Sequence, residues 1–350
     1  MKKRKKILLI TLCVIATLFS CLKIYYAIRN CKFDHKTIGN TTDENMGFAL
    51  ENIVTELGAC QGDEIIVINS VSKRYLANSF ISALAKKEIK YIQFNPTANT
   101  DSLQILKSLI EEQNRHRFFV FFISHEDAGF LFEYTGRPDQ GLKIPAKYLF
   151  SDWLMPEDVF IRIKGIDLKE NIRYQQTLLS KLDTINIIRV TTEVGTDISF
   201  FARNWVTHSG EVFCTPIEKH SNGTIVVDGC IFTGPPREFV KLVVVNGKVV
   251  NVNCLQENDE QQNMLKRSFL TDNNSTVLSE IGIGTNKNAL FTGELMESEQ
   301  ARKTCHFGFG HNIEYGGIIE NKNHFDLVVL NPTITINGKL IYDRGNLIED

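Results

Sequence analysis

The second half of this 350-residue chain places acids and histidines beside glycines and other small residues. The richest stretch is CHFGFGHNIEYGGIIENKNHFD, from Cys305 to Asp326, which holds three of the eight histidines. Carboxylates and imidazoles bind divalent cations well and need no thiolate beside them. The composition of this stretch therefore predicts a metal site in the second half of the chain.

The HFD sequence gives the most specific spacing. His324 and Asp326 are two residues apart, and on a strand that spacing puts both side chains on one face. The other candidate donors are Glu211 in SGEVFCTP, Glu280 in SEIGIGTN, and Glu299 and His306 in ESEQARKTCHFGFG. Two metal ions need roughly five or six protein ligands. Each fragment is a weak signal alone, but together they supply enough donors for two ions.

An α/β pattern precedes the donor residues in the sequence. The expected strands are 64–69, 89–94 and 117–123, and the expected helices are 72–88 and 102–115. Strands that are apolar throughout and alternate with helices are typical of a parallel sheet buried on both faces. No glycine-rich phosphate-binding motif follows any of these strands. We predict a doubly wound α/β domain over residues 46–190 that serves as a scaffold.

From residue 191 the sequence changes to short apolar runs separated by turn signals. Asn246-Gly247 and Asn337-Gly338 are typical of two-residue hairpin turns. A helix near 169–182 and a strand at 184–190 lead into this region, and a helix near 256–270 interrupts it. We predict a β-rich catalytic metal-binding domain over residues 191–350.

The first 30 residues have the pattern of a targeting segment. MKKRKK precedes an apolar run from Ile7 to Leu22, as in a signal peptide or signal anchor. Continued to Ile28, the run reaches the roughly 20 residues that a membrane-spanning helix needs. A lipoprotein signal ending at Cys21 and a buried helix are further alternatives. The basic cluster predicts that the polar linker at 31–45 and all that follows lie on the non-cytoplasmic side.

Charge and cysteine content exclude several other classes of protein. The formal net charge is -2 with acids and bases well mixed, so no basic field is present to hold a nucleic acid. The eight cysteines include no C-x-x-C pair, which excludes a zinc knuckle or a thioredoxin motif.

Five motifs of the second half occur in the order and at the separations found in a known family. They are GTDISFFARNW, GEVFCTPIEKHSNGTIVVDG, EIGIGTN, ESEQARKTCHFGFGHN and HFDLVVLNPTITINGK. Over about residues 191–341 the chain resembles the thermophilic metallo-aminopeptidases of the aminopeptidase T and aminopeptidase S type. The resemblance implies removal of N-terminal residues from short peptides by a water that two divalent cations (Zn, Co, Mn or Mg) activate. It also implies a homodimer.

The same resemblance assigns roles to individual residues. It implies metal ligands at Glu211, Glu280, Glu299, His306, His324 and Asp326, and all six positions keep a residue able to bind metal. Glu299 is also the candidate for moving a proton during catalysis. The tyrosine that stabilises the oxyanion in the family falls on Ile313, so Tyr315, the nearest phenol, is the candidate replacement.

Two other functions remain open. The same fold resembles that of the ring-cleaving 2,5-dihydroxypyridine dioxygenases, which hold one Fe(II) with two histidines and one carboxylate. These enzymes have a histidine where this chain has Glu280 and lack equivalents of Glu299 and His306. His306, His324 and Asp326 could still form such a triad here. The other function is a non-catalytic binding module that keeps the metal for stability, which the missing tyrosine and the N-terminal segment would favour.

Overall fold

The computed structural model describes residues 43–95, 100–112, 114, 116–123, 148–150, 156–183, 185–208, 210–232, 234–236, 238–253 and 260–348. The predicted targeting segment and most of the predicted linker lie outside these residues, and the first described helix begins at Asp43. None of the described helices is long and apolar enough to cross a membrane.

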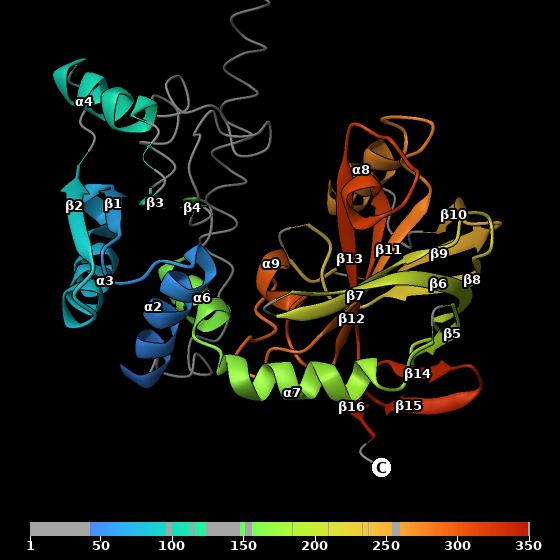
Figure 1. Cartoon of the computed structure of the whole chain (residues 1–350). Coiled ribbons are helices and arrows are strands. Elements are labelled where there is room, and N and C mark those ends of the chain that lie inside the picture. The colour runs from blue at the N-terminus through green and yellow to red at the C-terminus, as the bar shows by residue number, and fades with distance from the viewer. Residues whose placement is uncertain are drawn as a thin grey trace, which may run out of the picture. The chain divides into compact units, whose positions relative to one another are not determined.

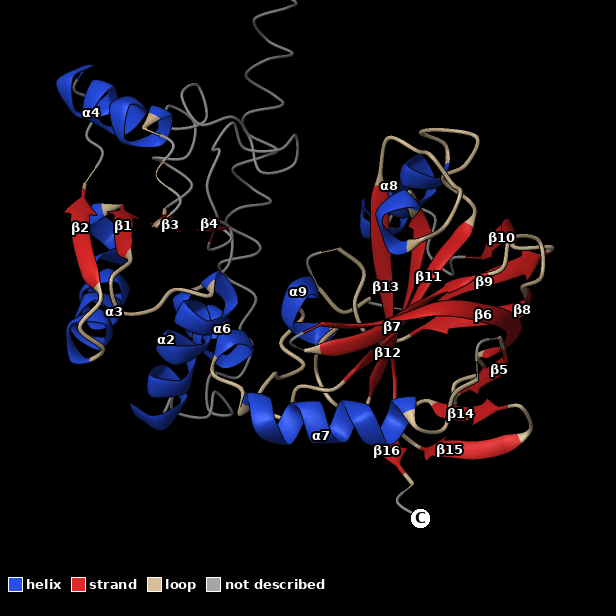
Figure 2. Cartoon of the chain, viewed as in Figure 1, coloured by secondary structure: helices blue, strands red, loops and turns tan. Residues whose placement is uncertain are grey.

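The N-terminal part contains a four-stranded parallel sheet with the strand order β2-β1-β3-β4 (Figures 1 and 2). Its strands are β1 (Glu64–Asn69), β2 (Lys90–Phe94), β3 (Arg117–Phe122) and β4 (Tyr148–Phe150). Its helices are α2 (Asp43–Leu57), α3 (Arg74–Lys86), α4 (Thr100–Glu111) and α6 (Glu157–Lys164), with a short 3-10 turn at Val71–Lys73. The predicted strands and helices of this part are confirmed.

Helices cover both faces of the parallel sheet, which explains why its central strands are apolar throughout. Ile65 and Val67 of β1 pack in one cluster with residues of α2, α3 and α6. Ile66 and Ile68, on the opposite face, pack with Leu106 of α4. The predicted doubly wound architecture is therefore confirmed.

The C-terminal part is built around a twelve-stranded sheet with antiparallel pairing. Its principal path is β13-β12-β11-β7-β6-β5-β14-β15-β16, and β8, β9 and β10 branch from β6. The strands are β5 (Asn186–Thr191), β6 (Asp197–His208), β7 (Glu211–Pro216), β8 (Asn222–Val227), β9 (Val240–Val245), β10 (Lys248–Asn253), β11 (Leu278–Gly284), β12 (Thr304–Gly310), β13 (His324–Leu330), β14 (Thr333–Ile336), β15 (Lys339–Asp343) and β16 (Asn346–Leu347). The helices are α7 (Leu168–Leu179), α8 (Glu260–Phe269) and α9 (Leu295–Ser298), with a 3-10 turn at Ile313–Tyr315.

Both predicted Asn-Gly hairpins are present. Asn246 and Gly247 join β9 to β10 with φ of 48° and 77°, and Asn337 and Gly338 join β14 to β15 with φ of 51° and 81°. Positive φ at both central positions is what a tight turn between twisted antiparallel strands requires.

The sheet begins earlier than the sequence indicated. β5 was expected to close the α/β domain, but it pairs with β6 and β14 of the large sheet. Leu178 of α7 also packs into the core of that sheet. The β-rich part therefore starts before residue 191.

Candidate metal centre

Four neighbouring strands supply five of the six predicted metal ligands. Glu211 begins β7, Glu280 lies in β11, His306 in β12, and His324 and Asp326 in β13. These strands are consecutive in the sheet and lie side by side (Figure 1). The antiparallel register thus brings together residues that are up to 115 positions apart in sequence.

The donors form two groups that share one residue. In the first group, His306 Nε2 lies 3.4 Å from Glu211 Oε2 and 3.5 Å from Glu280 Oε1. In the second group, His324 Nε2 lies 3.3 Å from Glu280 Oε2 and 3.3 Å from Asp326 Oδ1. Glu280 therefore directs one carboxylate oxygen into each group, which is the arrangement expected of a carboxylate that bridges two cations.

Each of these five donors lies opposite a glycine on a neighbouring strand. Glu211 pairs with Gly284, His306 with Gly282, Glu280 and Asp326 with Gly308, and His324 with Gly310. A Cβ added at Gly308 would lie 2.7 Å from Glu280 Cβ and 2.8 Å from Asp326 Oδ1. The glycines leave the space into which the donor side chains project.

Glycine is common in turns, but both glycines of the CHFGFG segment lie within a strand. Gly308 and Gly310 lie in strand β12 on the face that carries His306. The alternation of glycine with apolar residues in HFGFG and EIGIG was the sequence signal for this face. Gly316, with φ of 80°, does lie in a turn.

The donor chemistry fits bound cations. Glu211 Oε2 and Asp326 Oδ1 are buried and have no hydrogen-bond partner among the described residues. Buried polar atoms are seldom left unpaired unless a ligand or ion completes them. Glu299 is buried close enough to interact electrostatically with both groups, which makes four carboxylates in all. Bound cations would favour the ionised form of all four, and four negative charges would equal the charge of two divalent cations.

The pKa values of the donors report the strength of this negative field. Burial lowers the pKa of both imidazoles, but the carboxylates around them outweigh it and raise His306 to about 10 and His324 to about 11. Burial also raises the pKa of Glu211 to about 7. For Glu280 the hydrogen bonds from the two histidines overcome burial and lower the pKa to about 2. The centre thus favours positive charge at the positions where cations would bind.

Two contacts orient the second donor group. His324 Nδ1 lies 2.7 Å from the backbone carbonyl of His311, so Nδ1 carries the proton and Nε2 faces Glu280 and Asp326. The ring of Tyr315 packs edge-on against His324 with 5.6 Å between centroids, and against Phe213 at 5.4 Å. The predicted replacement tyrosine therefore borders the centre.

Glu299 stands apart from both donor groups. It caps the C-terminus of α9 and is 8% exposed. Burial, and then the charges of Glu211 and Asp326, raise its pKa well above the usual range. Glu299 therefore lies beside both donor groups without belonging to either of them.

His208 is a neighbour of the centre that the sequence did not single out. Its Nδ1 lies 3.8 Å from Glu211 Oε1 across the β6–β7 turn, and its side chain is 59% exposed. The THSGE spacing across a short turn was the available signal.

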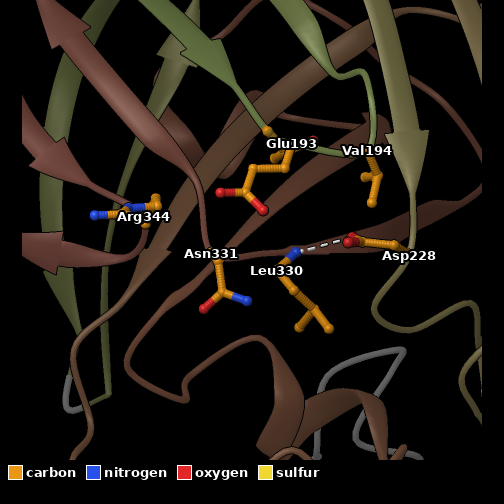
Figure 3. Close-up of a pocket in the computed structure, with 7 residues that line it drawn as sticks. Glu193, Val194, Asp228, Leu330, Asn331 and Arg344 are labelled. Atoms are coloured by element: carbon orange, nitrogen blue, oxygen red, sulfur yellow. Dashed lines mark hydrogen bonds between the residues drawn. The ribbon is translucent and has the colours of Figure 1, made fainter.

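A cavity of about 280 Å³ lies away from the donors (Figure 3). It is lined by Thr192, Glu193, Val194, Asp228, Leu330, Asn331 and Arg344. Leu330 is four residues beyond Asp326 in β13, roughly 13 Å along the strand. Within the cavity Asp228 Oδ1 accepts a hydrogen bond from Leu330 N at 2.9 Å. The cavity is therefore separate from the metal centre.

Comparison with known proteins identifies the family. A family model named NicX and described as 2,5-dihydroxypyridine 5,6-dioxygenase matches residues 156–349, more than half of the chain. The chain belongs to the NicX family. The match spans the whole metal centre and begins one residue before α6, ahead of the large sheet. No curated protein sequence matches the chain.

Solved structures show the same fold at low identity. The 2,5-dihydroxypyridine dioxygenase from Pseudomonas putida KT2440 is 16% identical with a TM-score of 0.62, and the match covers 88% of this chain and 98% of that one. Wild-type AmpT from Thermus thermophilus is 13% identical with a TM-score of 0.59, covering 88% of this chain and 99% of that one. The mixed α/β and β-rich fold class is thereby confirmed.

These matches correct the family predicted from the sequence. The family model identifies NicX, and the expected aminopeptidase family is supported only as a distant structural likeness. NicX membership and the two donor groups together support a metal-dependent enzyme. The comparisons favour a dioxygenase over a peptidase as the type of enzyme.

Proposed function

We propose that this NicX-family protein is a dinuclear metallohydrolase that releases N-terminal residues from short peptides. The observation that carries the proposal is Glu280, whose two oxygens belong to two different donor groups. A single-metal site needs no carboxylate shared in this way.

Glu211, Glu280 and His306 would hold one cation, and Glu280, His324 and Asp326 the other. Two such cations supply a water of lowered pKa and polarise a carbonyl group. The donor set of carboxylates and imidazoles suits Zn, Co, Mn or Mg.

The remaining chemistry falls to residues of this chain. Glu299 in its ionised form would accept a proton from the attacking water and then return it to the amine nitrogen of the leaving peptide, because burial and the nearby carboxylates make it a stronger base. The Tyr315 hydroxyl would donate a hydrogen bond to the carbonyl oxygen as negative charge develops on it. The hydrogen bond between His324 and His311 would hold the imidazole in position.

A mononuclear Fe(II) dioxygenase is the second candidate, and the family match favours it. His306, His324 and Asp326 provide two histidines and one carboxylate. This assignment leaves Glu211, Glu280 and Glu299 as extra buried carboxylates beside a single divalent ion. The excess negative charge is the reason that we place the hydrolase first.

Metal content and turnover of the purified protein distinguish the candidates. We expect two equivalents of Zn or Co per chain and release of leucine from leucyl peptides. One equivalent of iron with oxygen uptake on 2,5-dihydroxypyridine would replace the hydrolase by the dioxygenase. Two bound cations without either turnover would favour a binding module.

Two variants test the assigned roles. Tyr315→Phe should lower kcat roughly 100-fold with KM nearly unchanged, because the lost hydrogen bond acts in the transition state. Tyr174→Phe is the matched control, since that hydroxyl pairs with Tyr342 at 3.3 Å. Equal activity of Tyr315→Phe and the wild type would remove Tyr315 from the mechanism.

Two further predictions concern the oligomeric state and the location of the protein. A homodimer and a non-cytoplasmic location anchored by residues 1–30 stay predictions from the sequence. Cross-linking of the full chain and protease protection of vesicles would test them.

A further inference from the structure

A buried ion pair connects α6 to the segment that carries Glu299. Arg162 of α6 is 3% exposed and Glu297 of α9 is fully buried. Arg162 Nε donates to Glu297 Oε1 at 2.5 Å, and Nη2 donates to Glu297 Oε2 at 2.9 Å. The pair joins residues 135 positions apart, and Glu297 is two residues before Glu299.

The carboxylate of Glu297 organises the chain around it. Leu290 N donates to Oε1 at 3.0 Å, and Thr292 Oγ1 donates to Oε2 at 2.9 Å. The backbone carbonyl of Glu297 accepts from Gln300 N and Ala301 N at 3.2 and 3.1 Å. Side chain and backbone of one residue thus fix the segment on both sides of Glu299.

The same segment is attached to the end of α6 at two further points. Asn286 Nδ2 donates to the carbonyl of Ile163 at 3.2 Å, and Asn288 Nδ2 donates to the carbonyl of Gly165 at 2.7 Å. Residues 286–299 are therefore held by α6 as well as by the sheet.

Glu299 needs such support because it ends a very short helix. It is the C-terminal cap of α9 and is 8% exposed. The four-residue α9 is far too short to be stable by itself. A charged pair buried this deeply is a weak means of general stabilisation, which points to a more specific role.

We propose that the Arg162–Glu297 ion pair positions Glu299 beside the two donor groups of the metal centre. Arg162 and Glu297 are positioning residues and contact no substrate. The inference rests on the assignment of Glu299 to the centre in the proposed function.

Cation affinity of the whole protein, measured by equilibrium dialysis with Zn²⁺ alone, provides the test. Glu297→Gln should weaken the binding of the more weakly held cation about tenfold, as loss of a supporting residue commonly does. Glu56→Gln is the matched control, because it removes another ion pair of α6, Lys164–Glu56 at 2.8 Å, and leaves the Arg162–Glu297 pair in place. Affinity in the control should stay within about twofold of the wild type.

A double-mutant cycle separates positioning from general stability. In a Glu299→Gln background, Glu297→Gln should change cation affinity less than about twofold, because the residue that it positions has lost its charge. An equal loss in both backgrounds, or no loss in either, would overturn the proposal.

Arg162→Lys covers the case in which Glu297→Gln does not fold. Lysine keeps the charge but cannot form both hydrogen bonds. It should weaken cation binding in the same direction, by about threefold, and again only when Glu299 is present. Wild-type affinity in this variant would count against the proposal. A failure of peptide hydrolysis would leave this binding experiment intact, so the two proposals can fail separately.

Discussion

The two sheets of the molecule use their strands in different ways. In the parallel sheet, Ile65 to Ile68 and Phe118 to Phe122 are apolar and buried on both faces. In the antiparallel sheet, β11 and β12 are also buried throughout, but apolar side chains such as Ile281 and Phe307 pack into the core from one face. The other face of these strands and of β13 carries the metal donors and the glycines.

The difference shows what a catalytic face of a sheet requires. Packing fills all the space between side chains, so a densely packed face leaves no room for ions or substrate. At the centre, glycine removes the side chain opposite every strand donor, and the donor occupies the space beside the missing Cβ. One sheet is thereby specialised for stability and part of the other for chemistry.

The largest expected effect tests the stability assigned to the parallel sheet. Phe119 is 1% exposed and stacks near Phe121, so Phe119→Ala should lower the free energy of unfolding by about 3–5 kcal/mol. Cation affinity of the remaining folded protein should not change. Chemical denaturation and equilibrium dialysis measure the two quantities, with the exposed Tyr75→Ala as the control. If Phe119→Ala lost cation binding without a change in the free energy of unfolding, the assignment of stability to one sheet and chemistry to the other would be contradicted.

Replacing the shared carboxylate tests the chemistry assigned to the other sheet. Glu280→Gln keeps the size of the side chain but removes the charge that both donor groups use. We expect activity to fall at least about 100-fold and one cation equivalent to be lost. Asp228→Asn, in the separate cavity, should retain both cations. Retention of two cations by Glu280→Gln would exclude a bridging role.

Replacing the facing glycine should have a smaller effect through the same centre. In Gly308→Ala the new methyl group would press on Glu280, Asp326 and His324, the last at 2.9 Å from Cε1. We expect cation binding to weaken about 10- to 100-fold while circular dichroism is unchanged. Gly234→Ala is the matched control, since no atom lies within 4 Å of its added Cβ. Equal affinities in the two variants would mean that the donors do not need the space.

Local sequence patterns predicted many features of this molecule. Features that depend on pairing between distant residues could not be predicted. The apolar strand runs, the Asn-Gly hairpins and the six candidate donors could all be identified from the sequence. The role of Gly308 could not, because it depends on Glu280 and Asp326 lying on either side of it in the sheet. The Arg162–Glu297 pair was hidden for the same reason.

The sequence motifs also did not identify the family. All six donor positions fit the aminopeptidase pattern and only some fit the dioxygenase pattern, so residue identity at these positions favoured the family that the family model does not identify. The spacing of HFD, by contrast, correctly placed His324 and Asp326 on one face, because the strand period of two is local.

The smallest effect concerns an ion-pair cluster that ties α7 to the β-rich sheet. Glu170 pairs with Lys287 and lies 3.1 Å from Arg302 Nη2, and the hydrogen bond from Lys287 is the main reason that its pKa is below the usual value. A depressed pKa contributes stability above the pKa of the unfolded chain, near 4.5, and that stability is lost as pH falls through the folded value.

Glu170→Gln should therefore lower the free energy of unfolding at pH 7 by less than about 1 kcal/mol, since the carboxylate is partly exposed. The difference from the wild type should shrink as pH falls below about 4.5, because the carboxyl takes up a proton first in the unfolded chain and then in the folded protein. Urea denaturation of the cation-free proteins between pH 7 and pH 3.5 measures this difference. A difference in the free energy of unfolding that stays constant over that range would show that Glu170 acts through packing. The contrast between a charged, glycine-lined sheet face and an apolar scaffold would then not extend to α7.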